Sequence, residues 1–234
     1  MSDDPIFICH MPSEAFAAAA TGINRWPDSP PAKLFWHNDG GVGKVSALDF
    51  RGIIPFGLRK IEGACGIRFE YTPNIKTANI VLRQARHGEG GMGQPGNVLA
   101  DCELVPPGLR SNSDFQATNR YDGFEDWSSA TDLVGGRVPM MNVVAHEVAH
   151  GVGLGHAPAG SNDLQAPSIQ RGVTEFGTWA KREFVRRYGE SASAPQPGAP
   201  PAAGDVWETK YQNGLLIVKR NGVLQRLSPS PFGG

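Results

Sequence analysis

Three histidines and one glutamate in the stretch from Val143 to His156 have types and a spacing that suit zinc chemistry. His146 and His150 are four residues apart, so on a helix they share a face, about 6 Å apart along the axis, and can reach one ion. His156 follows a short turn and can supply a third nitrogen, and Glu147 lies directly after His146. The pattern predicts a zinc site with a carboxylate beside it.

Three histidine ligands leave one corner of a zinc tetrahedron for water, which is typical of catalytic rather than structural sites. Zinc lowers the pKa of bound water to about 7 and polarises a carbonyl group. Glu147 is placed to take the water's proton and to pass it to a leaving amine. The stretch therefore predicts amide hydrolysis with Glu147 as general base. The full five-residue pattern is much more specific than His-Glu-x-x-His alone.

The same stretch must form a helix that serves both the core and the site. Apolar residues recur with helical spacing to make a buried row, and polar residues make a second row toward the metal. Pro139 suits the first position of this helix, and Gly153 suits the left-handed conformation that ends one. The apolar row comprises Met140, Val144, Val148 and Val152, and the polar row comprises Asn142, His146 and His150.

The pattern His-Glu-x-x-His-x-x-Gly-x-x-His resembles the zinc-binding consensus of the metzincin metallopeptidases, and residues 153–156 are most similar to the matrixin, or matrix-metalloproteinase-like, branch. The similarity extends from about residue 33 to residue 189. Residues 78–82 are similar to the matrixin strand before the loop over the active site. Residues 96–100 resemble the edge strand that binds substrate, and residues 121–127 resemble the acidic stretch ahead of the active-site helix.

This resemblance implies an α+β fold of the metzincin, zincin-like kind: a twisted mixed β-sheet, an active-site helix, and a small C-terminal subdomain with a helix. It implies a protein or peptide substrate that pairs with the edge strand at Val98, Leu99 and Ala100. Pro167 would belong to the outer wall, residues 166–169, of the pocket for the residue just past the cut.

Gln165 departs from the family's pattern, because matrixins have at this turn a methionine that packs beneath the metal without binding it. Glutamine has a similar unbranched length. We expect it to fill the same space and to hydrogen-bond to neighbouring backbone. The alternative is an offset turn in which Gln165 points to solvent.

Matrixins hold a second, structural zinc and calcium in the matching loops, and this chain departs there too. Asp101, Cys102 and Arg120 stand where histidine ligands would be expected, which argues against the structural zinc. His87 is then interpreted as a solvated loop residue.

Asp122 and Glu125 could bind calcium together with backbone carbonyls, although acidic pairs in loops are usually only solvated. His10 and His37 have no partner in sequence and are interpreted as structural.

Composition excludes some classes of partner. The chain has 234 residues and a net charge of −1, so nothing favours nucleic acid or an anionic membrane as a partner. No stretch resembles a membrane span. Residues 1–4 are acidic where a secretory signal would be basic and then apolar. We expect no signal peptide in this chain, although the resemblance implies a secreted enzyme.

The cysteines Cys9, Cys65 and Cys102 are odd in number and irregularly spaced, which predicts no disulfide framework. Either the compartment is reducing, or one pair forms and one thiol stays free. A matrixin prodomain cysteine blocks the zinc, but residues 8–12 do not match that motif.

Periodicity predicts the elements that position the site. Pro55 either begins a helix at residues 55–62 or kinks a longer one that begins near Ser46. A second helix is expected at residues 174–188. Strands are expected at residues 33–37, 67–71, 79–84 and 97–104.

The chain divides by composition into four segments. An N-terminal extension, residues 1–32, precedes the metallopeptidase domain, residues 33–190. Residues 191–204 form a Pro/Ala-rich linker. Two Asn-Gly pairs in residues 205–234 predict a small three-stranded β-meander tail. This tail is too small to be stable alone, so we expect it to dock on the domain or to bind a partner.

Three functions remain open from the sequence. The first is a zinc-dependent endopeptidase that acts on protein or peptide substrates. The second is a binding or assembly protein that keeps the fold with weak or lost catalysis, and the third is a zinc amidase for a non-peptide amide. Glu147 favours an enzyme, because a binding protein has no need of that carboxylate.

Overall fold

The computed structural model describes residues 6–7, 33–95, 98–104, 116–133, 135–191, 207–212, 215–220 and 223–229. The chain forms two compact units, Met1–Ala194 and Pro195–Gly234. Cys9, His10 and the predicted linker beyond Ser191 lie outside the described residues. No helix in the described part of the chain is long and apolar enough to cross a membrane.

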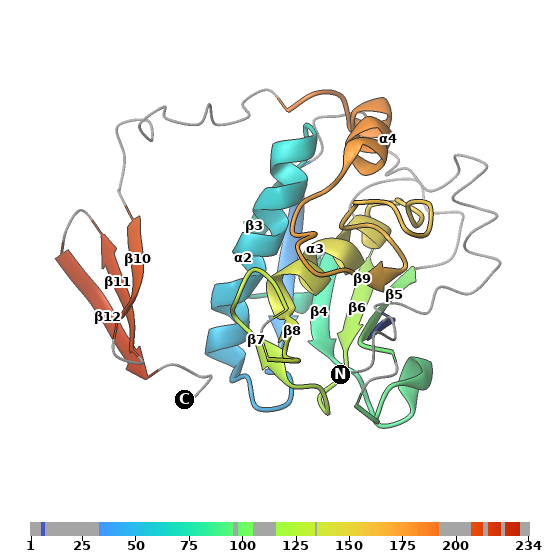
Figure 1. Ribbon diagram of the computed structural model, residues 1–234. Helices are drawn as coiled ribbons and strands as arrows, with labels where there is room; N and C mark the ends of the chain where they lie inside the picture. Colours follow the sequence, from blue (N-terminus) through green and yellow to red (C-terminus); the bar gives the residue numbers. More distant parts are fainter. Residues whose placement is uncertain are drawn as a thin grey trace. The chain divides into compact units, whose positions relative to one another are not determined.

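A five-stranded mixed sheet forms the centre of the first unit, in the order β3-β2-β4-β6-β5 (Figure 1). β3, β2, β4 and β6 run parallel, and β5 pairs antiparallel with β6 at one edge. The predicted α+β class with a mixed sheet is confirmed at this level. The strands are β2 (Lys33–Asp39), β3 (Arg68–Tyr71), β4 (Ile80–Gln84), β5 (Ala100–Leu104) and β6 (Ala117–Tyr121).

Alternating burial explains why β2 has one face toward the core. Leu34 and Trp36 are buried, whereas Lys33 and Phe35 are exposed, because successive side chains of a strand point to opposite faces. His37 is half-buried, and its Nδ1 lies 2.9 Å from the carbonyl oxygen of Thr72. This contact fits the structural role that the sequence suggested for His37.

Two strands differ from the prediction. β6 was not predicted. Its buried face carries Ala117, Asn119 and Tyr121, and the polar Asn119 interrupts the alternation of apolar and polar residues that marks a strand. The strand expected at residues 97–104 begins at Ala100.

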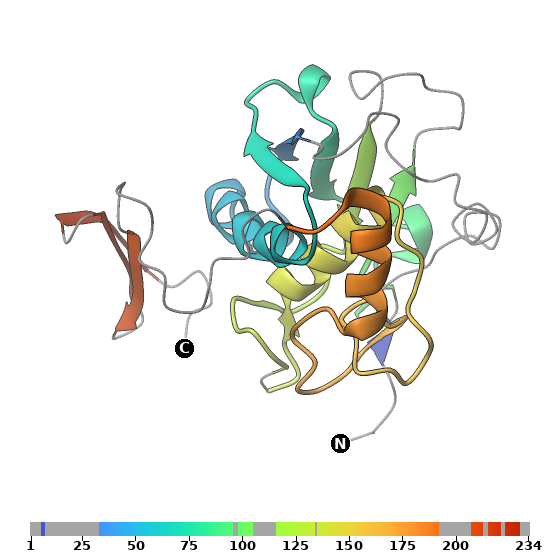
Figure 2. The ribbon, with the colours of Figure 1, turned by 90° about the horizontal axis from the view of Figure 1, so that it is seen from above.

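Helices α2 (Ala47–Ala64) and α3 (Met140–Gly151) pack together on one side of the sheet (Figure 2). The Oγ of Ser46 accepts a hydrogen bond from the N–H of Asp49 and caps α2. Pro55 lies inside α2, so the longer of the two predicted helices is correct. The helices approach closely at Gly57, where a Cβ atom would lie 2.8 Å from the Met141 carbonyl oxygen.

Helix α4 (Thr178–Tyr188) begins four residues later than predicted. Glu175 is held outside the helix, because its carbonyl accepts a hydrogen bond from the N–H of Leu164. At the other end of α4, the Tyr188 hydroxyl donates to the carbonyl of Val152 at 2.6 Å. α4 is thereby joined to the end of α3.

Short elements complete the described structure. β1 (Ile6–Phe7) pairs antiparallel with β9 (Ser168–Ile169), and β7 (Trp127–Ser128) pairs parallel with β8 (Val138–Pro139). Two 3₁₀ helices are η1 (Ile75–Thr77) and η2 (Glu89–Gly91). In the second unit, β10 (Trp207–Gln212), β11 (Leu215–Arg220) and β12 (Val223–Pro229) form an antiparallel meander. The two Asn-Gly pairs fall between these strands, outside the described residues.

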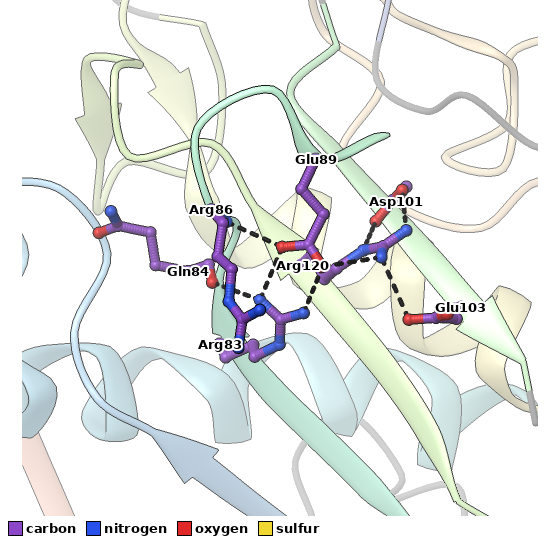
Figure 3. A network of polar contacts seen from close by, with 7 residues as sticks. All are labelled: Arg83, Gln84, Arg86, Glu89, Asp101, Glu103 and Arg120. Atoms are coloured by element: carbon purple, nitrogen blue, oxygen red, sulfur yellow. Dashed lines mark hydrogen bonds and ion pairs between the residues drawn. The ribbon is translucent and has the colours of Figure 1, made fainter. Parts of the chain in front are cut away.

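A network of charged side chains joins β4, β5, β6 and η2 (Figure 3). Arg120 is the register partner of both Arg83 and Asp101, and its guanidinium donates to the two Asp101 oxygens at 2.6 and 2.7 Å. The Glu89 carboxylate accepts from Arg83 at 2.6 and 2.9 Å and from Arg120 at 3.0 Å. Glu103 contacts Arg120 at 3.1 Å. These bonds tie the edge strand β5 and the glycine-rich loop, residues 86–95, to the sheet.

Charge balance explains the arrangement of this network. Arg83 and Arg120 lie directly opposite each other, and like charges at such positions repel. Glu89 lies between them, and the hydrogen bond from Arg83 is the main reason that the pKa of Glu89 falls to about 2. Burial raises the pKa of Asp101, and Arg120 opposes that shift. The Arg120 guanidinium therefore favours the ionised form of this buried carboxyl group.

We expect Arg120→Met to lower the free energy of unfolding by about 3 kcal/mol, because it leaves Asp101 as a buried charge without its partner. The Arg120 and Asp101 side chains are only 14% and 7% exposed. Urea denaturation at pH 7 measures the change. Lys33→Met is the control, since it removes an ion pair with Glu70 in which both side chains are 54% exposed, and it should cost less than about 1 kcal/mol. Equal losses in the two variants would contradict this account.

Candidate metal centre

The C-terminal end of α3 has the hydrogen bonds of a Schellman motif. The N–H of Gly153 donates to the carbonyl of His150 at 2.8 Å, and the N–H of Leu154 donates to the carbonyl of Ala149 at 2.9 Å. Gly153 has a φ of 91°, which a residue with a Cβ atom rarely adopts, so glycine is required here. The chain reverses within a few residues and returns toward the helix, as the sequence predicted.

Three imidazoles converge where the chain returns. One ring nitrogen from each of His146, His150 and His156 lies within 4.8 Å of the other two. The ring centroids are 4.6 to 5.2 Å apart. Among the described residues, this is the only group of three or more histidine, cysteine or carboxylate side chains placed to hold a metal ion.

The hydrogen bonds of two rings determine which nitrogens face the centre. The Nδ1 of His146 lies 2.8 Å from the carbonyl oxygen of Leu164, and the Nδ1 of His150 lies 2.7 Å from that of Leu154. A carbonyl oxygen only accepts, so each Nδ1 carries the proton and each Nε2 presents a lone pair. The two Nε2 atoms are 3.0 Å apart. Two lone pairs at this distance repel each other, and a cation bound to both would remove the repulsion.

The electrostatics of the three rings also favour metal binding. Burial, aided by nearby His156, lowers the pKa of His146 to about 3. Burial lowers the pKa of His156 to about 4. It also moves the pKa of His150 well below its usual value, with further contributions from the other two rings. All three imidazoles are therefore neutral near pH 7, which is the form that binds a metal. Three neutral nitrogen donors suit zinc.

Glu147 is fully buried beside this centre. The pKa values of Tyr121 and Cys102 are raised mainly by the burial of these two side chains and next by the nearby Glu147 carboxylate. Glu147 therefore lies close to β6 and β5, between α3 and the edge of the sheet. Glu147 follows His146 directly along α3.

The turn at residues 163–166 is held by a buried carboxylate. Asp163 accepts from the N–H of Gln165 and from the N–H of Ala180 in α4, both at 3.0 Å. The carbonyl of Gln165 accepts from the N–H of Ala157 at 2.8 Å. Asp163 thus joins the turn to α4, and the Gln165 carbonyl joins the turn to the segment just after His156.

The Gln165 side chain is fully buried against a histidine of the centre. Its amide nitrogen lies 3.1 and 3.2 Å from the two ring nitrogens of His150, so it contacts the ring as a whole. The same nitrogen is 3.4 Å from the carbonyl oxygen of His146. This position excludes the alternative in which Gln165 points to solvent. The contact with the His146 carbonyl is the expected hydrogen bond to neighbouring backbone, although it is long. The amide oxygen has no hydrogen-bond partner among the described residues.

The residues predicted to bind substrate lie on two segments. Ala100 begins the edge strand β5, and Val98 and Leu99 precede it. Leu99 and Ala100 are buried, Val98 is half-buried, and the Leu99 carbonyl accepts from the N–H of Asp122. Pro167 is half-buried directly before β9, whose backbone pairs with β1.

The residues considered for calcium have other contacts. The Asp122 carboxylate accepts from the N–H of Phe124 at 2.9 Å and from that of Gly93 at 2.7 Å, so it ties the glycine-rich loop to β6. Within the described ranges, Asp122 and Glu125 do not join a group of three metal-binding side chains. Calcium binding stays a prediction. His87 is exposed and its ring lies 5.7 Å from that of Phe124, centroid to centroid.

Sequence reasoning missed the groups that orient the ligands. The carbonyls of Leu154 and Leu164 have no sequence signal, because every residue has a carbonyl. Asp163 had a weak signal, since aspartate often accepts a hydrogen bond from the N–H two residues later. It was missed because such turns are usually at the surface.

No protein-family model matches this chain, and a search of curated proteins also found no match. The geometry of the three histidines and Glu147 is therefore the basis for assigning a function.

We expect one tightly bound zinc ion per chain, measured by elemental analysis after dialysis. His150→Ala should lose most of the zinc, because only His146 and His156 remain as nitrogen ligands. His37→Ala is the control and should keep a full equivalent, since His37 contacts Thr72 and lies outside the group. Less than half an equivalent in the parent, or full retention in His150→Ala, would count against the centre.

Gln165→Met should keep zinc affinity within about tenfold of the parent and change the free energy of unfolding by less than about 1.5 kcal/mol. Methionine has a similar length and removes an amide oxygen that lacks a partner among the described residues. Gln165→Ala should cost about 2–4 kcal/mol, because it leaves a cavity. Loss of zinc in Gln165→Met alone would show that the amide supports the ligands directly.

Proposed function

We propose that this chain is a zinc-dependent endopeptidase of the metzincin, matrixin-like kind. His146, His150 and His156 would hold the zinc, and Glu147 would act as general base. The convergence of two Nε2 lone pairs at 3.0 Å, with a third histidine within reach, is the observation that carries the proposal.

Bound zinc would supply Lewis-acid chemistry at the scissile carbonyl and acidify water at the site. Glu147 takes a proton from the attacking water and delivers it to the amine that leaves. Its full burial keeps solvent from screening the carboxylate, so its charge acts strongly on groups close to it. His146 and His150 hold their ring orientation through the Leu164 and Leu154 carbonyls.

The edge strand supports a peptide as the substrate. β5 pairs with β6 on one side and is the last strand of its sheet. An extended peptide can add to such an edge through backbone hydrogen bonds, which every peptide sequence offers. α3 packs against β5, so a peptide on this edge would pass close to Glu147.

The decisive experiment compares the parent with Glu147→Gln on a peptide library, with cleavage followed by mass spectrometry. The variant should keep one zinc and lose at least about a hundredfold in kcat/KM, since it removes the proton carrier and leaves every ligand in place. Glu190→Gln, at an exposed position, is the control and should behave like the parent.

Other outcomes would favour the other functions. A parent that binds zinc and cleaves no peptide would favour a binding protein, or an amidase for a non-peptide amide if simple amides are hydrolysed. Activity of Glu147→Gln within tenfold of the parent would place the base elsewhere.

A further inference from the structure

A fully buried asparagine lies in the middle of the sheet face that α2 and α3 cover (Figure 2). Asn119 stands between Ala117 and Tyr121 on the buried face of β6. Its register partners, Leu82 in β4 and Cys102 in β5, are buried as well, and such partners point to the same face of a sheet. The Asn119 side chain therefore points into the core between the sheet and the helices.

The hydrogen-bonding groups of Asn119 are not used within the described structure. Neither its Nδ2 nor its Oδ1 has a hydrogen-bond partner among the described residues. The hydroxyl of Tyr121, two residues further along the same face, is in the same state. A buried amide without partners is unfavourable, and most buried polar side chains in proteins are hydrogen-bonded. Asn119 is therefore a candidate for a role at a nearby functional site.

The face of α3 that carries Glu147 rests on β5 and β6. Gly151 stands one helical turn after Glu147 on the same face of the helix. A Cβ atom on Gly151 would lie 3.3 Å from the Cβ of Ala117 and 3.6 Å from the Sγ of Cys102. Going back from Gly151 to Glu147 covers about 6 Å along α3. Going from Ala117 to Asn119 covers about 6 to 7 Å along β6.

The direction in which α3 crosses the sheet follows from the residues that sense the Glu147 charge. Burial first, and then the nearby Glu147 carboxylate, raise the pKa of Tyr121 and of Cys102. Tyr121 lies beyond Asn119 along β6, and Cys102 lies opposite Asn119 in β5. Asn119 thus lies between the two residues that sense the carboxylate, and its amide is placed beneath Glu147.

We infer that Asn119 is a positioning residue for Glu147, to which its amide is linked by one buried water molecule. The Asn119 Nδ2 donates to this water, and the water donates to the Glu147 carboxylate. Bridging waters are nearly as favourable as direct hydrogen bonds, and buried waters typically bind polar groups that have no other partner. The inference rests on the proposed peptidase function.

An amide suits this task better than a charged side chain. It holds a carboxylate in one orientation without placing a positive charge beside it, which would make the carboxylate a weaker base. A general base must lie within hydrogen-bond reach of the proton that it takes. Asn119 lies inside the core and does not touch the substrate, so its loss should lower kcat and leave KM nearly unchanged.

The first test measures kcat and KM of the full zinc-loaded chain on one peptide that the parent cleaves. Asn119→Leu has a similar volume and no amide, and it should lower kcat about tenfold through misalignment of the base. KM should stay within about twofold of the parent, with zinc content unchanged. Thr118→Val, on the opposite and partly exposed face of β6, is the control and should match the parent. A parent-like kcat in Asn119→Leu would overturn the inference.

The second test does not depend on activity, because it compares Tm values in a double-mutant cycle with Glu147→Met. Asn119→Leu should lower the Tm of the parent by about 3 °C or more, since it removes the link to the carboxylate. In Glu147→Met the amide has no such link. There, Asn119→Leu should leave the Tm unchanged or raise it, because an apolar group replaces an unpaired polar one. Equal shifts in the two backgrounds would overturn the inference.

Two smaller substitutions replace Asn119→Leu if that variant does not fold. Asn119→Ser and Asn119→Ala leave nearly the same space, but only serine keeps a donor. The serine variant should have the higher kcat and the higher Tm, and equal values would overturn the inference. If the parent cleaves no peptide, the proposed function fails, and the Tm comparison alone decides whether Asn119 is linked to Glu147.

Discussion

The hydrogen bonds from two histidine rings to the carbonyls of Leu164 and Leu154 are the contacts on which the candidate centre depends. Each bond gives its ring one protonation pattern and one orientation, and together they turn the Nε2 atoms of His146 and His150 toward each other. Neither carbonyl belongs to α3, so the helix alone does not make the site. The Schellman turn and the segment at residues 163–166 must be in place before the histidines can act together.

The turn at residues 163–166 is costly to build, because it buries polar groups. Asp163 and Gln165 are both nearly inaccessible to solvent, and buried polar groups are unfavourable unless they are hydrogen-bonded. Asp163 meets this requirement through backbone N–H groups. Gln165 meets it only in part, since its amide oxygen lacks a partner among the described residues. Such unmet polar groups concentrate where a protein binds or reacts, while packing elsewhere supplies the stability.

Charged side chains stabilise the edge of the sheet formed by β6 and β5. The ion pair of Arg120 and Asp101 occupies positions where the matrixin resemblance would place ligands of a structural zinc. A guanidinium with two short bonds to one carboxylate links two strands, and Glu89 extends the link to the glycine-rich loop. The loop and the edge strand are therefore joined to each other by these side chains. The edge strand proposed to bind substrate is held by these contacts.

The sequence alone determined the features that depend on neighbours along the chain. The spacing of His146 and His150 follows from helical geometry, and the end of α3 follows from Gly153, whose backbone conformation other residues rarely adopt. The Asn-Gly pairs likewise marked the meander of the second unit. Only the tertiary structure decided which carbonyls orient the rings, that Gln165 contacts His150, and that Arg120 pairs with Asp101. Strand β6 was also found only in the tertiary structure, because the buried Asn119 interrupts its alternating apolar pattern. These contacts join residues far apart in sequence, and a carbonyl or a buried amide has no pattern of its own before the chain folds.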